Sequence, residues 1–312
     1  MALTTTGTLS TTVRPYYERR FLLRSHENFV YEQLGMPGRI PKNEGKTVVW
    51  NRYTNPTSKD TALTEGTDPT PSGLSAQLVS ATLEQLGNYE QVTDLLDLTS
   101  VDQVIKSAMD LLAYEAAKSI DIKIRDDIYT GGQVIYATAA YSNSAGFSPT
   151  RNSIDANDVM SVNEVRRAKR LHGRMASRPH TKDRFVGIAH PDVLFDLEGD
   201  SNWVNAHVYT EKGINSVYNG EAGELYGTRF VETSMAPVLI NSGSAGTEVY
   251  VTQIIGKDFF GVSKLQNLET FVDAPSPRSP LRLYNDIGWK ASMASASLND
   301  SFCARVETAA TA

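Results

Sequence analysis

The densest set of chemically capable side chains in this chain lies in FVGIAHPDVLFDLEGDSNW, residues 185–203. One histidine, His190, precedes four acids within a dozen residues: Asp192, Asp196, Glu198 and Asp200. Metal sites and general acid–base sites are built from imidazoles and carboxylates of this kind. A metal-dependent hydrolase that uses His190 with Asp192 or Asp196 is therefore one hypothesis.

The secondary structure expected for this stretch separates the histidine from most of the acids. RFVGIAH predicts a strand that ends before Pro191, because the residue before proline prefers extended backbone. Pro191 suits the first position of a helix, and Asp192 its first turn, where an acid is stabilised by the helix dipole. The stretch then divides into a strand, a proline-started helix and an acidic loop.

The apolar residues of this predicted helix give it one buried face: Val193, Leu194 and Leu197. Asp196, Glu198 and Asp200 fall at its end and in the loop, far from His190. A metal site would need a further histidine, and the candidates are distant in sequence: His172, His180 and His207. We interpret the stretch as structural.

The sequence lacks the other common signatures of catalysis and cofactor binding. It has no GxGxxG opening a helix after a strand, GxxxxGK[ST], HExxH, CxxC or GxSxG. The spaced glycines Gly220, Gly223 and Gly227 follow a poor strand, so we interpret them as turn glycines. The sequence predicts no catalytic, metal or cofactor-binding residue, and no enzyme.

Charge and composition exclude several classes of protein. The 312 residues carry a net charge of −6, the wrong sign for a protein that condenses nucleic acid by neutralising phosphates. Cys303 is the single cysteine, so no disulfide forms within the chain and a reducing compartment is expected. The first residues lack the pattern of a signal peptide, and no apolar run is long enough to cross a bilayer. We expect a soluble protein made in cytoplasm.

The first half predicts segments that cannot bury their own apolar surface. Residues 13–35 form an amphipathic arm that carries Tyr17, Phe21 and Phe29. Residues 47–53 and 77–92 read as two strands joined by a polar, proline-containing loop. That loop exceeds the usual length of a connection in a compact domain, so we predict a projecting hairpin ordered by a partner.

Residues 101–130 predict a helix about 45 Å long. Ser100 and Gln103 have the spacing of a capping box, and Gly131 and Gly132 end the pattern. Asp121 and Arg125 have the spacing of a favourable i,i+4 pair. One apolar stripe follows the whole helix: Val101, Val104, Ile105, Ala108, Leu112, Ala116, Ile120, Ile124 and Ile128.

The second half predicts short helices and strands. A helix starting near Asp155 turns Val159, Val162, Val165 and Leu171 inward. Its basic residues, which include Arg166 and Arg170, form either a solvated face or a phosphate contact, and no aromatics interleave them. GTRFVETS and TEVYVTQIIGKDFFGV are strand-rich, DAPSPRSP (273–280) reads as a boundary, and a strand-rich segment ends the chain.

Taken together, the order of these segments resembles that of tailed-phage major capsid proteins with the Hong Kong 97-type fold, an α+β fold. FVGIAHPDVLFDLEGDSNW, GELYGTRFVETS and IGWKASMASASLND resemble segments of the major capsid family of N-four-like podophages. The resemblance covers most of the chain after about residue 13. The order and spacing of the motifs carry it, rather than any single motif.

The resemblance implies a division of the chain: an N-terminal arm (1–45), an extended hairpin loop (46–98), a peripheral domain with the long helix as its spine (99–150), an axial domain (151–275) and strands that return to the peripheral domain (276–312). It also implies contacts between subunits. The candidates are Tyr17, Phe21, Phe29, Trp50, Lys59, Glu65, Asp68, Arg166 and Arg170. Some proteins of this fold cross-link their hairpin through a lysine, and Lys59 lies in the loop, but the sequence shows no partner asparagine.

By this resemblance, the chain forms pentamers and hexamers of an icosahedral shell around double-stranded DNA, without sequence-specific binding. Its other partners are a portal protein and a possible scaffolding or decoration protein; no membrane is involved. The shell is assembled in the host bacterial cytoplasm and becomes the virion capsid. A bacterial nanocompartment (encapsulin-like) shell protein, which shares the fold, and the hydrolase above are the alternatives.

Overall fold

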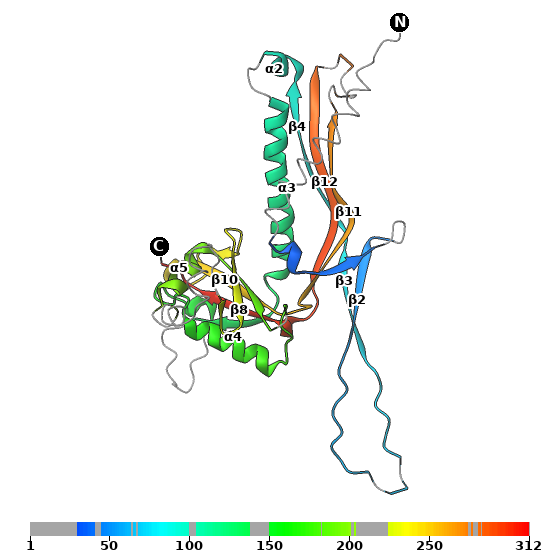
Figure 1. Ribbon diagram of the computed structural model, residues 1–312, viewed down its shortest axis with the longest axis vertical. Coiled ribbons are helices and arrows are strands. Elements are labelled where there is room, and N and C mark those ends of the chain that lie inside the picture. Colours follow the sequence, from blue (N-terminus) through cyan, green and yellow to red (C-terminus); the bar gives the residue numbers. More distant parts are fainter. Residues whose placement is uncertain are drawn as a thin grey trace.

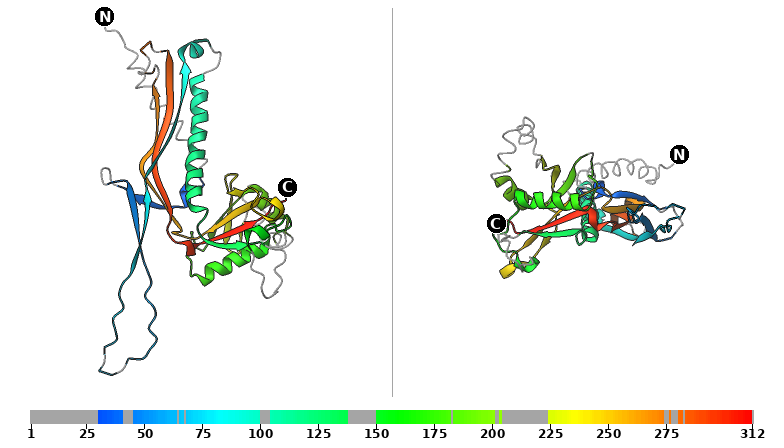
Figure 2. Two further views of the ribbon diagram at one scale, coloured as in Figure 1. Left: turned by 180° about the vertical axis from the view of Figure 1, so that it is seen from behind. Right: turned by 90° about the horizontal axis from the view of Figure 1, so that it is seen from below.

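The computed structural model is an elongated subunit with a hairpin projecting from it (Figure 1). It describes residues 30–40, 45–63, 65–66, 68–99, 104–137, 150–181, 183–200, 203, 224–273, 276, 280–281 and 283–311. A tall four-stranded sheet with one long helix makes one body. A seven-stranded sheet with two helices makes a second body beside its base (Figures 1 and 2).

The four-stranded sheet has the order β1-β11-β12-β4. These strands are β1 (Met36–Arg39), β11 (Phe260–Asp273), β12 (Tyr284–Ser297) and β4 (Glu84–Thr93). β1 is parallel to β11, and the other neighbours are antiparallel. The short helix α2 (Asp94–Thr99) follows β4 at the far tip of the sheet (Figure 1).

The predicted long helix is present as α3 (Val104–Ile128), and it stands along this sheet (Figure 2). The predicted stripe is the buried one: from Ala108 to Ile128, its residues Leu112, Ala116, Ile120 and Ile124 included, are at most 6% exposed. They form one core with β4, β11 and β12. Val101 and the predicted cap lie outside the described residues.

Asp121 and Arg125 interact through their charges, since burial raises the pKa of Asp121 and Arg125 lowers it, but the direct partners of both side chains are other groups. Asp121 is buried, and its Oδ1 accepts hydrogen bonds from the backbone N–H groups of Val30 (3.2 Å) and Tyr31 (2.9 Å). Arg125 pairs with Asp126 at 2.7 Å and donates to the carbonyl of Met235. The carboxylate of Asp121 thus fixes the backbone at Val30 and Tyr31 to α3, and it makes no direct hydrogen bond to Arg125, one turn away.

The projecting hairpin consists of β2 (Thr47–Tyr53) and β3 (Ala76–Thr82), paired from Thr47↔Thr82 to Tyr53↔Ala76. The predicted single strand over 77–92 is therefore wrong: β3 and β4 are separate strands that meet at Leu83. The chain changes partner there, since β3 pairs with β2 whereas β4 pairs with β12. The hydrogen-bonded pairing of β3 with β2 therefore ends at Thr82, although the residues that follow are also typical of strands.

The second sheet runs β5-β13-β10-β6-β8-β7, with β9 added beside β10. Its members are β5 (Gln133–Tyr136), β13 (Cys303–Thr308), β10 (Val249–Ile255), β6 (Phe185–Ala189), β8 (Thr228–Glu232), β7 (Glu224–Leu225) and β9 (Val238–Leu239). Helices α4 (Val162–Arg174) and α5 (Pro191–Gly199) share one core with it. The short helices η1 (Glu32–Leu34), η2 (Arg151–Ser153), η3 (Ser244–Gly246) and η4 (Asp300–Phe302) lie in connections.

The second predicted helix begins later than expected. α4 starts at Val162, and the side chain of Ser161 caps it by accepting from the N–H of Asn163. Asp155 lies instead in a turn closed by Asp158, and Val159 makes a β-bridge with Ala309. The apolar residues before the cap therefore join the sheet rather than the helix.

Two connections carry the chain between the sheets, side by side. Residues 256–259 lead from β10 to β11, and residues 298–302 lead from β12 back to β13. The N–H of Gly256 donates to the carbonyl of Phe302, and the N–H of Leu298 to that of Phe259, both at 2.8 Å. The expected boundary at 273–280 falls instead on the connection between β11 and β12 of one sheet.

The C-terminal end of α3 is also held by the second sheet. Gln253 on β10 donates to the carbonyl of Ile128 (3.2 Å). Arg305 on β13 donates to the carbonyls of Tyr129 (3.1 Å) and Thr130 (2.6 Å). These carbonyls lie at and just beyond the end of α3, where helix carbonyls run out of partners in the helix, and that of Ile128 also accepts from the N–H of Gly131 (3.0 Å), so the second sheet helps to cap the long helix.

Candidate inter-subunit surfaces

The stretch around His190 folds as predicted, with His190 as the cap of α5 and Pro191 at its first position. The Nδ1 atom of His190 lies 3.3 Å from the backbone nitrogen and 3.1 Å from the Oδ2 atom of Asp192. The hydroxyl of Tyr250 donates to the same carboxylate at 3.2 Å. Burial, together with this hydrogen bond, raises the pKa of Tyr250.

The other acids of the stretch hold separate parts of the backbone. Asp196 accepts from the N–H of Thr311 (2.9 Å), and Asp200 from the N–H of Val162 (3.0 Å). Across the described ranges, no group of three or more His, Cys, Asp or Glu side chains is arranged to hold a metal ion. Asp196 and Asp200 thus tie α5 to the chain terminus and to α4, rather than converging on the histidine.

The remaining candidate histidines lie apart from His190. His172 is buried in α4, stacks on Phe185 with ring centroids 4.2 Å apart, and its Nε2 contacts the carbonyl of Ile254 at 3.1 Å. His180 contacts the carbonyl of Leu34 at 3.2 Å. His207 is outside the described residues. Each described histidine thus has a structural environment of its own.

The hairpin presents exposed side chains along most of its length. Val49, Tyr53 and Leu78 are between 53% and 66% exposed, which is unusual for large apolar residues in strands. Beyond them, Lys59 donates to the carbonyl of Thr70 across the loop. Among the described residues 54–75, every side chain is exposed.

The predicted contact residues of the hairpin fall into two groups. Glu65 and Asp68 are exposed near its tip, beyond Lys59. Trp50 is half-buried, and its ring fills the space over Gly261 and Gly38, where a Cβ atom would lie 2.8 and 3.2 Å from it. Trp50 therefore anchors the base of the hairpin to the four-stranded sheet of its own chain. Tyr17, Phe21 and Phe29 lie outside the described residues.

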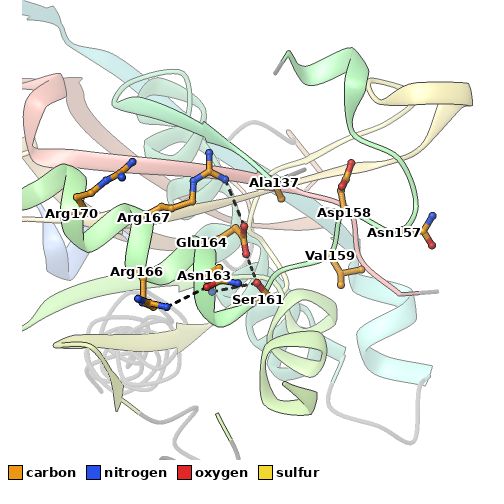
Figure 3. A pocket seen from close by; sticks show the side chains of 10 residues that line it. All are labelled: Ala137, Asn157, Asp158, Val159, Ser161, Asn163, Glu164, Arg166, Arg167 and Arg170. Atoms are coloured by element: carbon orange, nitrogen blue, oxygen red, sulfur yellow. Dashed lines mark hydrogen bonds and ion pairs between the residues drawn. The ribbon is translucent and has the colours of Figure 1, made fainter. Parts of the chain in front are cut away.

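A hollow of about 790 Å³ lies beside α4, where the helix faces Ala137 and residues 157–159 (Figure 3). Its lining joins apolar groups such as Val159 to three arginines of the helix, among them the predicted contact residues Arg166 and Arg170. Ser161 donates to the buried carboxylate of Glu164, and Arg167 lies 3.6 Å from that carboxylate. A second hollow of about 320 Å³ continues past Arg167 and Arg170 towards Arg174.

Two exposed apolar features were missed by the sequence analysis. At the tip of the four-stranded sheet, five leucines are 48% to 80% exposed: Leu95, Leu96, Leu98, Leu281 and Leu283. On α5, Phe195 is 71% exposed. Phe195 could have been identified from the sequence, because it lies off the apolar stripe of its helix. The tip could have been identified from DLLDLT, which has three leucines in six residues.

None of the described helices is long and apolar enough to cross a membrane. In sequence, the chain matches no protein-family model and no curated protein. The structural similarity is extensive. The Cyanophage Pam1 capsid asymmetric unit superposes with a TM-score of 0.70 at 13% identity, covering 92% of each chain.

Two further capsids have comparable similarity. The capsid of Ralstonia phage GP4 gives a TM-score of 0.64 at 13% identity, over 91% of this chain and 92% of the other. The acidic stable capsid of Helicobacter pylori bacteriophage KHP30 gives 0.65 at 10% identity, over 88% of each chain. The predicted α+β capsid fold is therefore confirmed. The kinship with N-four-like podophages stays a prediction, since no sequence match bears on it.

Proposed function

We propose that this chain is the major capsid protein of a tailed phage, and that it assembles into an icosahedral shell enclosing double-stranded DNA. The observation that carries the proposal is a likeness to a capsid subunit over 92% of both chains. Because the superposition extends over nearly all of both chains, the likeness concerns the whole subunit and not a single sheet that many folds share. A relation to N-four-like podophages, resting on the segments quoted above, is part of the proposal.

Within this proposal, the parts of the fold take the roles known for Hong Kong 97-type subunits. The hairpin β2–β3 is the extended loop, and the four-stranded sheet with α3 is the peripheral domain. The seven-stranded sheet is the axial domain. We assign β11 and β12 to the peripheral domain and β13 to the axial one, following the strand pairing; this shifts the boundaries expected at 151–275 and 276–312.

Self-association gives the exposed apolar surfaces a purpose. A two-stranded ribbon is marginal in water, and Tyr53 and Leu78 on this one lack cover from the rest of the subunit. A neighbouring subunit under the hairpin would supply that cover, as would one against the leucines of the tip. Modest contacts of this kind, repeated by closed symmetry into pentamers and hexamers, add up to a stable shell.

The remaining proposed partners follow from a shell that a motor fills with DNA. They are a portal protein, a scaffolding or decoration protein, and DNA held without sequence-specific contacts, which suits a chain with a net charge of −6. We place assembly in the host cytoplasm and the product in the virion. The proposed role needs no cofactor and no catalysis.

The alternatives are weaker. A nanocompartment shell is not favoured, because the similar structures are capsids of phages. A hydrolase centred on His190 is not favoured either, since Asp196 and Asp200 are engaged by backbone N–H groups elsewhere.

The test is the assembly state of the purified chain. Expressed alone and concentrated, it is expected to form rings of five or six subunits or closed shells, seen by negative-stain microscopy and sedimentation. A chain that stays monomeric up to its solubility limit would contradict the proposal. Shells that copurify with one enzyme and contain no DNA would favour the nanocompartment.

A further inference from the structure

Helix α4 has a strongly basic outer face in a protein that is acidic as a whole. Its thirteen residues include five arginines and lysines and one acid, a net charge of +4, whereas the entire chain carries −6. Arg166, Lys169, Arg170 and Arg174 are exposed on the helix, and Arg178 is exposed just beyond its end. Positive charge is therefore concentrated on one short segment of the surface, which we call the basic face.

The only acid of α4 does not neutralise this face. Glu164 is buried, accepts a hydrogen bond from Ser161 and lies 3.6 Å from Arg167. Arg167 also donates to the carbonyl of Tyr136 at 3.1 Å. Glu164 and Arg167 thus belong to the internal packing of the subunit, and neither is part of the basic face.

The five residues of the basic face keep their charge within the subunit. Arg166 donates weakly to the neutral side chain of Asn163 (3.5 Å), and Lys169 lies 5.9 Å from the ring centroid of Tyr226. The other three side chains make no hydrogen bond or ion pair with any residue that the structure describes: Arg170, Arg174 and Arg178. No carboxylate of the described subunit therefore compensates the basic face.

The spacing of these residues is unfavourable for the helix by itself. Arg166, Arg170 and Arg174 follow one another at intervals of four residues, so they lie along one side of α4 about 6 Å apart. Like charges at this spacing destabilise a helix. An anion with many charges, lying along the helix, would replace this mutual repulsion by attraction.

The composition of the basic face suits nucleic acid better than a second protein. Protein interfaces have aromatic and apolar residues at their core. None of the exposed large apolar side chains among the described residues lies between positions 162 and 178. Interfaces with DNA are polar and strongly positive, and the guanidinium fork of arginine matches the oxygens of a phosphate.

The same segment favours a duplex over a single strand. Residues 166–178 contain no Phe, Tyr or Trp on which an unpaired base could stack. Contacts to the phosphates of a duplex need only the positive side chains, and they carry no sequence information. The basic face therefore has the groups for holding a double helix by its backbone and lacks those for reading its bases.

We propose that the basic face of α4 binds the phosphate backbone of the double-stranded DNA inside the shell, through Arg170, Arg174 and Arg178 with Arg166 and Lys169 beside them. This proposal rests on the proposed function, and it places α4 on the inner surface of the shell. Each subunit contacts only a few phosphates, and the acidic remainder of the chain repels DNA. DNA is thus held weakly by any one subunit and repeatedly around the shell.

The first test measures the affinity of the purified, unassembled chain for a fluorescein-labelled DNA duplex at low salt, by anisotropy. Arg170→Glu and Arg174→Glu should each weaken binding about tenfold. Lys118→Glu, at an exposed lysine of α3, makes the same change in charge and should bind within about twofold of the wild type. No binding by the wild type, or an equal loss with Lys118→Glu, would overturn the proposal.

The salt dependence of the same binding counts the phosphates. Each phosphate neutralised contributes about −0.9 to the slope of log affinity against log salt concentration. Arg174→Gln should therefore make the slope shallower by about one unit, whereas Lys118→Gln should leave it unchanged. Equal slopes for the wild type and Arg174→Gln would contradict a phosphate contact at this arginine.

Assembly without DNA distinguishes a DNA contact from a contact between subunits. In nuclease-treated samples, Arg170→Glu and Arg174→Glu should form rings or shells at the same protein concentration as the wild type. A requirement for about tenfold more protein would assign the basic face to an acidic surface of a second copy. That result would overturn the DNA contact and leave the capsid function standing, whereas a wild-type chain that never assembles would contradict the function itself.

A cysteine at Gly173 tests whether α4 faces the interior of the shell. Gly173 is exposed, and a Cβ atom added there would have no neighbour within 4 Å, so Gly173→Cys leaves the arginines in place. In closed shells this thiol should react with a small maleimide but not with one attached to a long polyethylene glycol chain. Cys303 is buried and adds little background. Equal labelling of closed shells and dissociated subunits by the large reagent would place α4 outside and overturn the proposal.

Discussion

Arg151 and Glu307, 156 residues apart in sequence, are joined by two parallel hydrogen bonds. Arginine Nε and Nη2 donate to Oε2 and Oε1 of the carboxylate at 2.7 and 2.8 Å. Glu307 is fully buried, and the Nε of Arg305 lies 3.1 Å from its Oε1. The hydrogen bond from Arg151 to this carboxylate raises the pKa of the arginine. The pair fastens η2 (Arg151–Ser153) to β13, the strand that holds Glu307.

Replacing Arg151 by alanine should lower the free energy of unfolding by about 2 to 3 kcal/mol. A buried carboxylate loses half of its partners, although Arg305 remains to limit the cost. Urea denaturation measures the change. Arg166→Ala, at an exposed arginine without a carboxylate partner, is the control and should shift stability by less than about 0.5 kcal/mol. Equal effects of the two substitutions would contradict the role given to the buried pair.

Substitutions at Leu111 and Leu112, which are adjacent on α3, test which face of the helix packs into the core. Leu112 is 1% exposed and Leu111 is 66% exposed. Leu112→Ala should cost about 2 to 5 kcal/mol, because it removes buried atoms and leaves a cavity. Leu111→Ala should cost less than about 0.5 kcal/mol. Thermal unfolding followed by circular dichroism distinguishes them, and a larger loss for Leu111 would contradict the packing.

The hairpin loop should matter for assembly and not for folding. Replacing residues 56–73 by a short glycine–serine turn removes only side chains that are exposed where the structure describes them. The melting temperature should stay within a few degrees of the wild type, while sedimentation shifts from shells to small species. Intact shells formed by the shortened chain would refute the assignment of the hairpin as a contact between subunits.

Acid should destabilise the subunit through His172. Burial, opposed by the hydrogen bond to Ile254, lowers the pKa of His172 to about 4 from its ordinary 6.5. Between these values the unfolded chain binds more protons, so stability is fully present above pH 6.5 and is lost as the pH falls towards 4. The loss should reach up to about 3 kcal/mol.

Unfolding curves from pH 7.5 to 4.5 measure this loss, with His172→Gln as the comparison. The variant should be less stable at neutral pH but show a flatter dependence on pH. Burial raises the pKa of Asp121, which acts with the opposite sign, but this residue is present in both proteins and cancels in the difference. Parallel curves for the two proteins would contradict the assignment to His172.

Cys303 should react with thiol reagents only after unfolding. The thiol is buried, and burial raises its pKa, so the reactive thiolate is scarce in the folded chain. Labelling with a chromogenic disulfide should be slow in buffer and fast in urea. Rapid labelling of the folded subunit would show that the junction between the sheets opens readily, since Cys303 begins β13 there.

How far the sequence predicts this fold depends on how local each signal is. Helix α5 follows from His190-Pro191 and an apolar stripe, which are neighbours in sequence, and its proline start and buried stripe are confirmed, although Asp196 lies inside the helix rather than at its end. The stripe of α3 is confirmed for the same reason. The separation of β3 from β4 could not be predicted, because residues 76–93 form strands throughout and only distant partners, β2 and β12, decide where one ends.

The candidate surfaces show the same division. Arg166 and Arg170 were named as contact residues on the strength of the family resemblance, and they line a hollow. The hollow itself depends on α4 lying beside β5 and residues 157–159, which no spacing rule reveals. Asp121 is a mixed case: the charge of Arg125 does favour its carboxylate, as the i,i+4 rule predicts, but its hydrogen bond goes to the backbone of Tyr31, which is 90 residues away and which the rule could not identify.

The capping of α3 by Gln253 and Arg305 has a mechanical consequence. The carbonyls at the end of α3 accept hydrogen bonds from side chains on β10 and β13 of the seven-stranded sheet. The connections 256–259 and 298–302, which are hydrogen-bonded to each other, also join the two sheets. A load applied to the seven-stranded sheet would therefore reach the end of the long helix through these hydrogen bonds as well as through the chain itself. In the proposed shell, such side-chain hydrogen bonds would stiffen the joint between the two sheets of each subunit.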